Sequence, residues 1–180
     1  MDIEAQIYKL GTTFVSIIGA NAIGAKDSGA VIDDLRHISN KVSVQAIDAN
    51  IVYGTEHLLE VLKITLESKR RKIMVAKNSE TDLLLRLSYT NQISLAVKYG
   101  GMKNNANCCF VIFAKDKNEL LKVNSFINKF FKADNSLLRP TPEKKKIISC
   151  KIGLTSIPIL FDDDFTFVRF ILERSCLIIK

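Results

Sequence analysis

The segment CCFVIFA, residues 108–114, and the segment DKNELLKVNSFINKF that follows it at residues 116–130 decide how the fold is interpreted. The first is a short continuous apolar run, which is typical of a buried strand. In the second, Asp116 precedes apolar residues that recur at helical spacing, so Asp116 is expected to cap a helix. Those apolar residues are Leu120, Leu121, Val123, Phe126 and Phe130.

Strand and helix signals also alternate on either side of this pair. Apolar and polar residues alternate from Val42 to Ala46, which predicts a half-buried strand, and Leu83–Leu87 is a second apolar run that we interpret as a buried strand. A helix is expected to start at Gly54-Thr55 with Thr55 as its cap. Further elements are expected as a strand at Thr13–Ile18, helices at Val31–Ile38, Ile93–Val97, Pro142–Cys150 and Asp164–Arg174, and a surface loop at Ala133–Pro142. Gly100 is expected to end the helix at 93–97 in a left-handed conformation.

This order of elements predicts an α/β or α+β fold, in which several helices pack on a small mixed β-sheet. The 180 residues are expected to form a single domain, residues 1–180, large enough to bury about two-thirds or more of its unfolded surface. No secretory signal is evident after Met1-Asp2-Ile3-Glu4, and Phe14–Ile23 is too short and too rich in Gly and Asn to span a bilayer. We therefore expect no membrane partner.

Composition narrows the class of partner. The net charge of +7 favours an anionic partner such as nucleic acid, and it is equally compatible with a lysine-rich solvated surface. The four cysteines, Cys108, Cys109, Cys150 and Cys176, form no CxxC pair, so we interpret them as reduced core residues of a cytosolic protein.

The usual signatures of catalysis and metal binding are weak. Gly19–Lys26 resembles a phosphate loop, but Ala25 separates Gly24 from Lys26, so a turn is the simpler interpretation. His37 and His57 have no cysteine at ligand spacing, and a structural role is expected for His57. Asp162-Asp163-Asp164 could attract a cation, but we expect a solvated turn whose last residue caps a helix. We expect no catalytic residue, no metal, no cofactor and no small-molecule substrate, although a triad assembled from distant residues stays open.

Two motifs resemble a known family. Residues 47–59, IDANIVYGTEHLL, resemble the opening motif of the TPRKB-like family, the kinase-associated accessory subunit of the KEOPS complex. Residues 83–93, LLLRLSYTNQI, resemble that family's apolar segment and turn, which ends in Gly-x-Arg-Gln-Ile, and the apolar C-terminus at 171–180 is also similar. The resemblance is firm from Ser43 to Phe113 and weak over the first forty residues and around Lys132–Lys146.

The resemblance implies a protein that is not an enzyme. Family members bind and regulate the small KEOPS kinase/ATPase, and through it the rest of the complex, and they bind the single-stranded 3′ CCA end of tRNA. The complex installs threonylcarbamoyl on the adenosine beside the anticodon, and other subunits perform that chemistry. A cytoplasmic location is expected, and also a nuclear one if the source is eukaryotic.

Polar residues around the turn at 88–92 are the candidates for RNA contact, because single-stranded RNA is held by cations, amides and flat side chains. Arg86 stands on an apolar segment and is expected to reach solvent or a partner. The competing interpretations are helix capping for Ser88 and Asn91 and a solvated face for the lysines. The full set is Lys72, Lys77, Arg86, Ser88, Asn91, Gln92, Lys98 and Tyr99.

The chain departs from the family at this turn. Asn91 stands where the family has arginine, which removes a bidentate phosphate contact, and Tyr89 stands where the family has glycine, which tolerates positive φ. Either Arg86 or the Lys69–Lys72 run compensates for this loss, or RNA binding is weak, and kinase binding would survive in both cases. If Tyr89 faces outward, it could add a stacking surface.

Apolar side chains beyond the needs of the core are the candidates for kinase contact, although core packing competes for each of them. They are Leu59, Val61, Val168, Ile171 and Leu172. Two rival functions remain: an interaction module that regulates the kinase without tRNA binding, and a small-molecule enzyme whose site would need a pocket with perturbed carboxylates.

Overall fold

The computed structural model describes residues 5–21, 28–154 and 163–179. The chain divides into two compact units. Unit 1 comprises residues 1–49 and 101–138, and unit 2 comprises residues 50–100 and 139–180. Helices and strands occur together, as the predicted α+β class requires, while the single domain of residues 1–180 stays a prediction.

Unit 1 is built on a β-sheet with the strand order β1-β2-β4-β3, and the short β5 pairs with the end of β2. All pairings in the described part of the chain are antiparallel, so the sheet is not the mixed one we expected. The strands are β1 (Gln6–Leu10), β2 (Thr13–Asn21), β3 (Val42–Asp48), β4 (Cys108–Ala114) and β5 (Lys132–Ala133).

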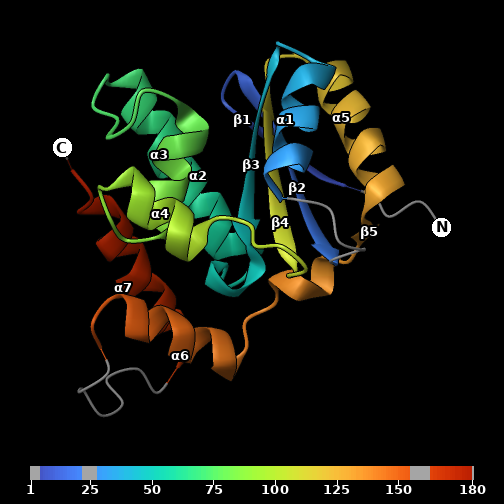
Figure 1. Cartoon of the computed structure of the whole chain (residues 1–180). Helices are drawn as coiled ribbons and strands as arrows, with labels where there is room; N and C mark the ends of the chain where they lie inside the picture. Colours follow the sequence, from blue (N-terminus) through green and yellow to red (C-terminus); the bar gives the residue numbers. More distant parts are fainter. Residues whose placement is uncertain (1–4, 22–27, 155–162, 180) are drawn as a thin grey trace. The chain divides into compact units, whose positions relative to one another are not determined.

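The apolar run at 108–114 becomes β4, which lies between β2 and β3 and is buried along its whole length. Side chains at alternate positions share a face, so Phe110 of β4 lies across from Ile18 of β2 and Ala46 of β3. Helices α1 (Ser28–Ile38) and α5 (Lys117–Phe130) supply Leu35, Leu120, Val123 and Ile127 to the same core cluster. Figure 1 shows these two helices side by side along the sheet.

The helix predicted after Asp116 and the capping role of Asp116 are both confirmed. Asp116 accepts a hydrogen bond from the Asn118 N–H at 2.8 Å, and α5 starts at the next residue. The strands at 13–18 and 42–46 and the helix at 31–38 are also confirmed, because they form β2, β3 and α1.

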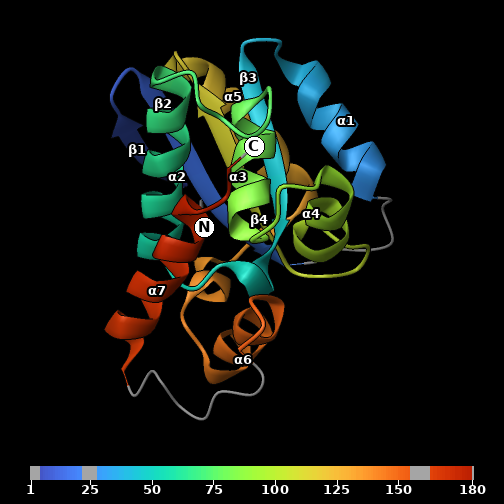
Figure 2. The same ribbon diagram turned by 90° about the vertical axis from the view of Figure 1, so that its left-hand side faces the viewer.

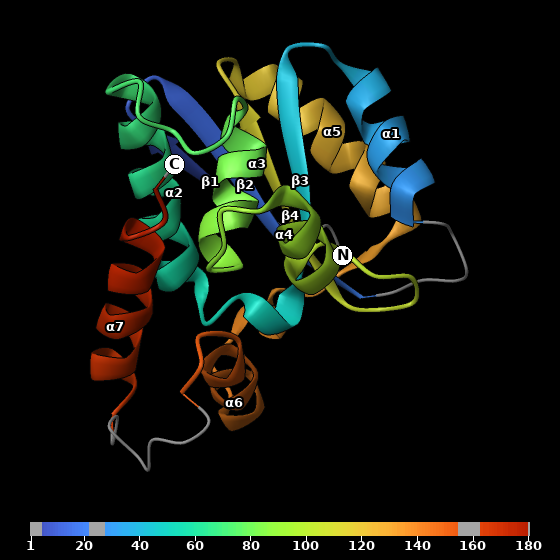
Figure 3. The same ribbon diagram turned by 60° about the vertical axis from the view of Figure 1, so that its left-hand side comes forward.

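Unit 2 is helical. It contains α2 (Thr55–Arg70), α3 (Ser79–Leu87), α4 (Ile93–Gly100), α6 (Pro142–Lys151) and α7 (Asp164–Cys176). Helix α3 contacts α2, α4 and α7, and α2 also contacts α7. Figures 2 and 3 show α7 beside α2, and they place α6 at the end of the unit opposite the loop that joins α2 to α3. Two 3-10 turns, Ala49–Ile51 and Asn135–Leu138, complete the described elements.

The predicted strand at Leu83–Leu87 is wrong, because these residues form most of α3. A short apolar run does not distinguish a buried strand from a buried helix. The acidic residues Glu80 and Asp82 in the first turn favour the helix, and Arg86 pairs with Asp82 one turn later. Helix α3 is short and almost entirely buried, which explains the continuous apolar run.

Two helix-cap predictions and the predicted surface loop also need correction. Gly54, with φ of 91°, is the N-cap of α2, and Thr55 is its first residue. Asp163, rather than Asp164, caps α7 by accepting a hydrogen bond from the Thr166 N–H at 2.7 Å. The expected loop at 133–142 has Ala133 in β5 and a 3-10 turn at 135–138, and Pro142 starts α6.

Candidate functional site

The turn between α3 and α4 is a helix C-terminal motif. The Thr90 N–H donates to the Leu85 carbonyl at 3.2 Å and the Tyr89 N–H donates to the Arg86 carbonyl at 3.3 Å, which is the Schellman pattern. The motif places Tyr89 in the left-handed region, with φ of 54°. The position therefore does require the positive φ that the family's glycine would supply at lower cost.

Tyr89 faces inward. Its ring packs against the cluster of Tyr53, Ile148, Phe167 and Ile171, and its hydroxyl oxygen is buried. Burial raises the pKa of this hydroxyl. The suggestion that Tyr89 offers an outward stacking surface is therefore wrong.

The prediction that Arg86 contacts RNA needs correction. Its side chain is buried, and three of its N–H donors are used inside unit 2. Nε donates to Asp82 Oδ2 at 2.7 Å, Nη1 donates to the Ser175 carbonyl at 3.0 Å, and Nη2 donates to Ser68 Oγ at 3.1 Å. An arginine on a buried segment did need a partner, but the partners are intramolecular.

The prediction that Ser88 contacts RNA also needs correction. It is buried, and its hydroxyl donates to the Ala96 carbonyl of α4 at 3.4 Å. Gly100 explains the close approach, because a Cβ at this residue would collide with Ser88 Oγ and lie 2.8 Å from Ile51 Cδ1. Gly100 is the last residue of α4 and is not one of the positive-φ glycines in the described chain, so its expected left-handed role is wrong. Its role is to let α4 approach α3.

The other RNA candidates are exposed, and they fall into two groups. Lys72 and Lys77 lie on the loop between α2 and α3, while Asn91, Gln92, Lys98 and Tyr99 lie on α4 and the turn before it. The Asn91 amide donates to the Ile179 carbonyl at 3.5 Å, and the Gln92 N–H donates to Thr90 Oγ1 at 3.2 Å.

Tyr99 is the centre of a small aromatic and cationic cluster. Its ring is 44 % exposed, and the Nζ atoms of Lys98 and Lys151 lie 5.3 and 5.2 Å from the ring centroid. Lys151 also donates to the Tyr99 carbonyl. Lys151 comes from α6, so its part in this cluster has no local signal in the sequence. The flat ring can stack on a base of a single strand, and the two ammonium groups can contact phosphates of that strand.

The basic run Lys69–Lys72 is partly neutralised. Glu67 accepts hydrogen bonds from Arg70 and Arg71, which lower the pKa of its carboxyl to about 2. Lys72 follows as the left-handed residue of a second Schellman motif, with φ of 60°, because its N–H donates to the Lys69 carbonyl and the Ile73 N–H donates to the Ser68 carbonyl. The Lys72 side chain is exposed.

The candidates for kinase contact divide between core and surface. Val61 and Ile171 are fully buried, so their assignment to a docking surface is wrong and core packing applies. Leu59, Val168 and Leu172 are half-buried. Phe165, which the sequence interpretation missed, is 71 % exposed, and at helical spacing it shares a stripe of α7 with Val168 and Leu172.

His57 has the structural role expected of it. It is fully buried in α2, and Nδ1 accepts a hydrogen bond from the Tyr53 N–H at 3.3 Å. Burial lowers the pKa of its imidazole to about 3, so the ring is neutral at physiological pH. His37 is exposed on α1, with Nδ1 2.6 Å from the Asp33 carbonyl.

The remaining sequence features are the cysteines, the candidate metal ligands and the glycine-rich segment. Cys108 and Cys109 are buried as expected, but Cys150 and Cys176 are exposed, so the core interpretation is wrong for the latter pair, and none of the four cysteines forms a disulfide. No three His, Cys, Asp or Glu residues are arranged to hold a metal among the residues described. Most of the glycine-rich segment, residues 22–27, and Asp162 lie outside the described residues.

The sequence matches the model of one known protein family. The family model described as kinase binding protein CGI-121 matches residues 23–149. The chain belongs to the CGI-121 family. This is the kinase-associated family that the motifs at 47–59 and 83–93 resemble, so that resemblance is confirmed. A search of the curated proteins gave no match.

The CGI-121 match covers parts of both units. It includes the two Schellman motifs, the loop between α2 and α3, and Tyr99, and it ends two residues before Lys151. The stripe on α7 follows the matched region. In the part of the chain that the structure describes, no helix is long and apolar enough to cross a bilayer.

Proposed function

We propose that this CGI-121 family member is a non-catalytic accessory subunit of the KEOPS tRNA-modification complex. In this proposal it binds and regulates the small KEOPS kinase/ATPase and recruits tRNA through the 3′ CCA end, in the cytoplasm and, in a eukaryote, also in the nucleus. Membership of a kinase-binding family is the observation that carries the proposal. The KEOPS and tRNA parts come from the resemblance of the motifs, and the exposed surfaces of unit 2 support them.

The tRNA part of the proposal is supported by the cluster of Tyr99, Lys98 and Lys151. Stacking of one base on an aromatic side chain contributes about 1–3 kcal/mol. We therefore expect Tyr99→Ala to weaken binding of CCA-ended RNA by about tenfold or more, since about 1.4 kcal/mol is a tenfold change. Lys63→Gln, which removes an exposed lysine of α2 paired with Glu60, is the matched control and should have little effect.

Titration with tRNA that has or lacks the CCA end tests this directly. Tighter binding of the complete tRNA, lost in Tyr99→Ala, supports recruitment through the 3′ end. Equal affinity for both tRNA forms would contradict it.

The kinase part is supported by the α7 stripe of Phe165, Val168 and Leu172. Aromatic residues, including Phe, are enriched in protein–protein interfaces. Phe165 contacts solvent over most of its surface, with the guanidinium of Arg169 5.7 Å from its ring, so Phe165→Asp should leave unit 2 folded. We expect this variant to lose at least tenfold in affinity for the purified kinase.

Leu121→Asp is the matched control for the kinase experiment, because Leu121 is an exposed apolar residue of α5 in unit 1. Loss of kinase binding in the Leu121 variant with retention in the Phe165 variant would place the kinase on unit 1.

The second candidate function is regulation of the kinase without tRNA binding. The burial of Arg86 and Ser88 and the presence of Asn91 in place of the family's arginine favour this alternative, because they remove candidate RNA contacts. Kinase binding together with no preference for CCA-ended tRNA would select it.

The absence of catalytic activity is also part of the proposal. A carboxyl that acts as a general acid at neutral pH needs a raised pKa. In the described chain, the carboxyls with a shifted pKa all shift downward, mainly through hydrogen bonds; they are Glu67, Glu119, Asp134, Glu143 and Asp163.

A further inference from the structure

The buried pair of Asp82 and Arg86 in α3 is not used by either proposed interface. Asp82 is fully buried and Arg86 is 3 % exposed. A buried ion pair seldom adds net stability, because the cost of removing two charges from water offsets their attraction. The contacts that surround the pair indicate what it does instead.

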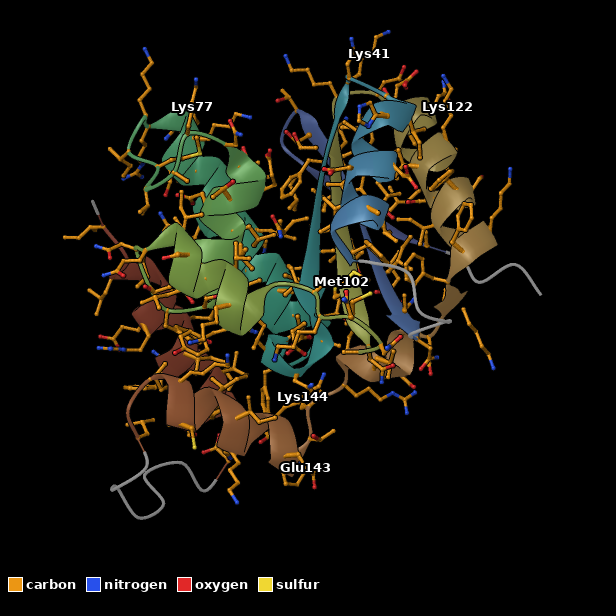
Figure 4. All side chains as sticks on the ribbon, viewed as in Figure 1. Lys41, Lys77, Met102, Lys122, Glu143 and Lys144 are labelled. Atoms are coloured by element: carbon orange, nitrogen blue, oxygen red, sulfur yellow. The ribbon has the colours of Figure 1, made fainter. Side chains whose placement is uncertain are left out.

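On one side, Asp82 holds the loop between α2 and α3. Its Oδ1 atom accepts hydrogen bonds from the Val75 N–H at 2.7 Å and the Ala76 N–H at 3.4 Å. This loop, residues 71–78, carries the exposed Lys72 and Lys77. Figure 4 shows Lys77 on this loop, at the end of unit 2 farthest from α6.

On the other side, Arg86 holds the last turns of two helices, α2 and α7. Its Nη2 atom donates to Ser68 Oγ in the last turn of α2, immediately before the basic run, and Nη1 donates to the Ser175 carbonyl in the last turn of α7. The Ser175 hydroxyl lies within donating distance of two carbonyl oxygens, that of Ile171 in α7 at 3.0 Å and that of Arg86 in α3 at 3.2 Å. The ion pair therefore joins one loop and the ends of two helices to α3.

We propose that Asp82 and Arg86 are positioning residues for RNA binding. They touch no RNA, but they fix the backbone of residues 71–78 so that Lys72 and Lys77 contact two phosphates of one strand together. A loop that is already ordered loses less conformational entropy on binding than a mobile one. This inference rests on the proposed tRNA recruitment, and it gives the conspicuous arginine of the 83–93 motif a role inside the protein.

The experiment compares two ways of changing the pair in the full chain. Asp82→Ala removes the acceptor for both loop amides. The double variant Asp82→Asn with Arg86→Gln removes both charges but keeps an acceptor oxygen beside Val75 and donors beside Ser175. Amide hydrogen exchange at Val75 and Ala76 reports on the loop, and binding of a single-stranded RNA that ends in CCA is measured against salt concentration.

We expect faster exchange at Val75 and Ala76 and weaker RNA binding in Asp82→Ala. The slope of log affinity against log salt should fall by as much as about 1.4, because each phosphate contact on a single strand contributes about 0.7. The double variant should restore slow exchange and most of the affinity. That rescue would separate positioning from a direct effect of the Asp82 charge. Lys72→Gly with Lys77→Gln should lose the same slope without faster exchange at Val75.

Three results would overturn the inference: unchanged exchange in Asp82→Ala, unchanged RNA binding despite faster exchange, or weak binding in the double variant with its loop protected. If Asp82→Ala does not fold, the double variant decides the question. No RNA binding by the unmodified protein would instead overturn the proposed tRNA recruitment. RNA binding that depends on Lys72 and Lys77 but not on Asp82 would overturn the positioning role alone.

Discussion

Acidification should destabilise this protein through the buried imidazole of His57. The ring is enclosed in unit 2, and Nδ1 accepts a hydrogen bond from the Tyr53 N–H, so the native state holds it in its neutral form. Burial lowers its pKa from 6.5 to about 3. The unfolded chain therefore binds a proton as the pH falls below 6.5, while the native state does not until the pH approaches 3.

The sign and the size of the effect follow from this difference in pKa. The stabilising contribution is complete above pH 6.5 and is lost progressively as the pH falls toward 3. With one proton bound by the unfolded state alone, the free energy of unfolding falls by up to about 1.4 kcal/mol per pH unit. Between pH 7 and pH 5 the loss from His57 comes to about 2 kcal/mol.

The assay is urea unfolding of the wild type and of His57→Asn at several pH values between 7 and 5. The asparagine Oδ1 atom can take the place of Nδ1 as acceptor for the Tyr53 N–H, but it does not titrate in this range. The smaller side chain will destabilise the variant at neutral pH. The gap between the two proteins should shrink by about 2 kcal/mol on acidification, because other titrating groups are common to both.

His37→Asn is the matched control, since it removes the other histidine from an exposed site on α1. The gap between this variant and the wild type should change less across the same pH range than the gap for His57→Asn does. A gap between wild type and His57→Asn that stays constant from pH 7 to pH 5 would refute the reasoning, as would an NMR titration in which His57 becomes protonated near pH 6.

Substitutions at three further positions test the helix ends and the contact between α3 and α4. Lys72→Gly should stabilise the protein by up to about 1 kcal/mol in denaturant unfolding, because glycine adopts the left-handed conformation at this Schellman position without a Cβ penalty; a destabilised variant would show that the lysine stem makes a larger contribution. Gly100→Ala should cost about 1–3 kcal/mol, because Ser88 Oγ and Ile51 Cδ1 must move to accommodate its Cβ, and a neutral result would show that these side chains adjust freely. Asp116→Ala should cost about 1 kcal/mol and Asp116→Asn much less, since asparagine keeps the acceptor for the Asn118 N–H; equal losses would contradict the capping role.

Local patterns in the sequence were sufficient for the sheet and its helices in unit 1. The apolar run at 108–114, the alternation from Val42 to Ala46 and the capping residue Asp116 all have short-range physical causes, and the structure confirms each of them. They do not specify which strands become neighbours. The antiparallel order β1-β2-β4-β3 depends on contacts between distant segments.

The turn at 88–92 shows the same division within the candidate site. The family motif indicated that position 89 needs a positive φ, and the structure has Tyr89 at 54°. The motif did not indicate that Tyr89 and Ser88 point inward, because their burial depends on α4 and on the cluster around Phe167.

The sequence by itself specifies the kind, charge and helical spacing of each residue. These properties were enough to identify a basic α+β protein of the CGI-121 family. The sequence was not enough to show which polar side chains are available to a partner, because that depends on which residues the folded chain packs against them. Arg86 shows why: the guanidinium that was expected to reach solvent or a partner donates instead to Ser175, 89 residues away, Ser68, 18 residues away, and Asp82, 4 residues away. Lys151 shows the converse, since folding brings it across 52 residues to Tyr99 and creates a cationic surface that no contiguous segment contains.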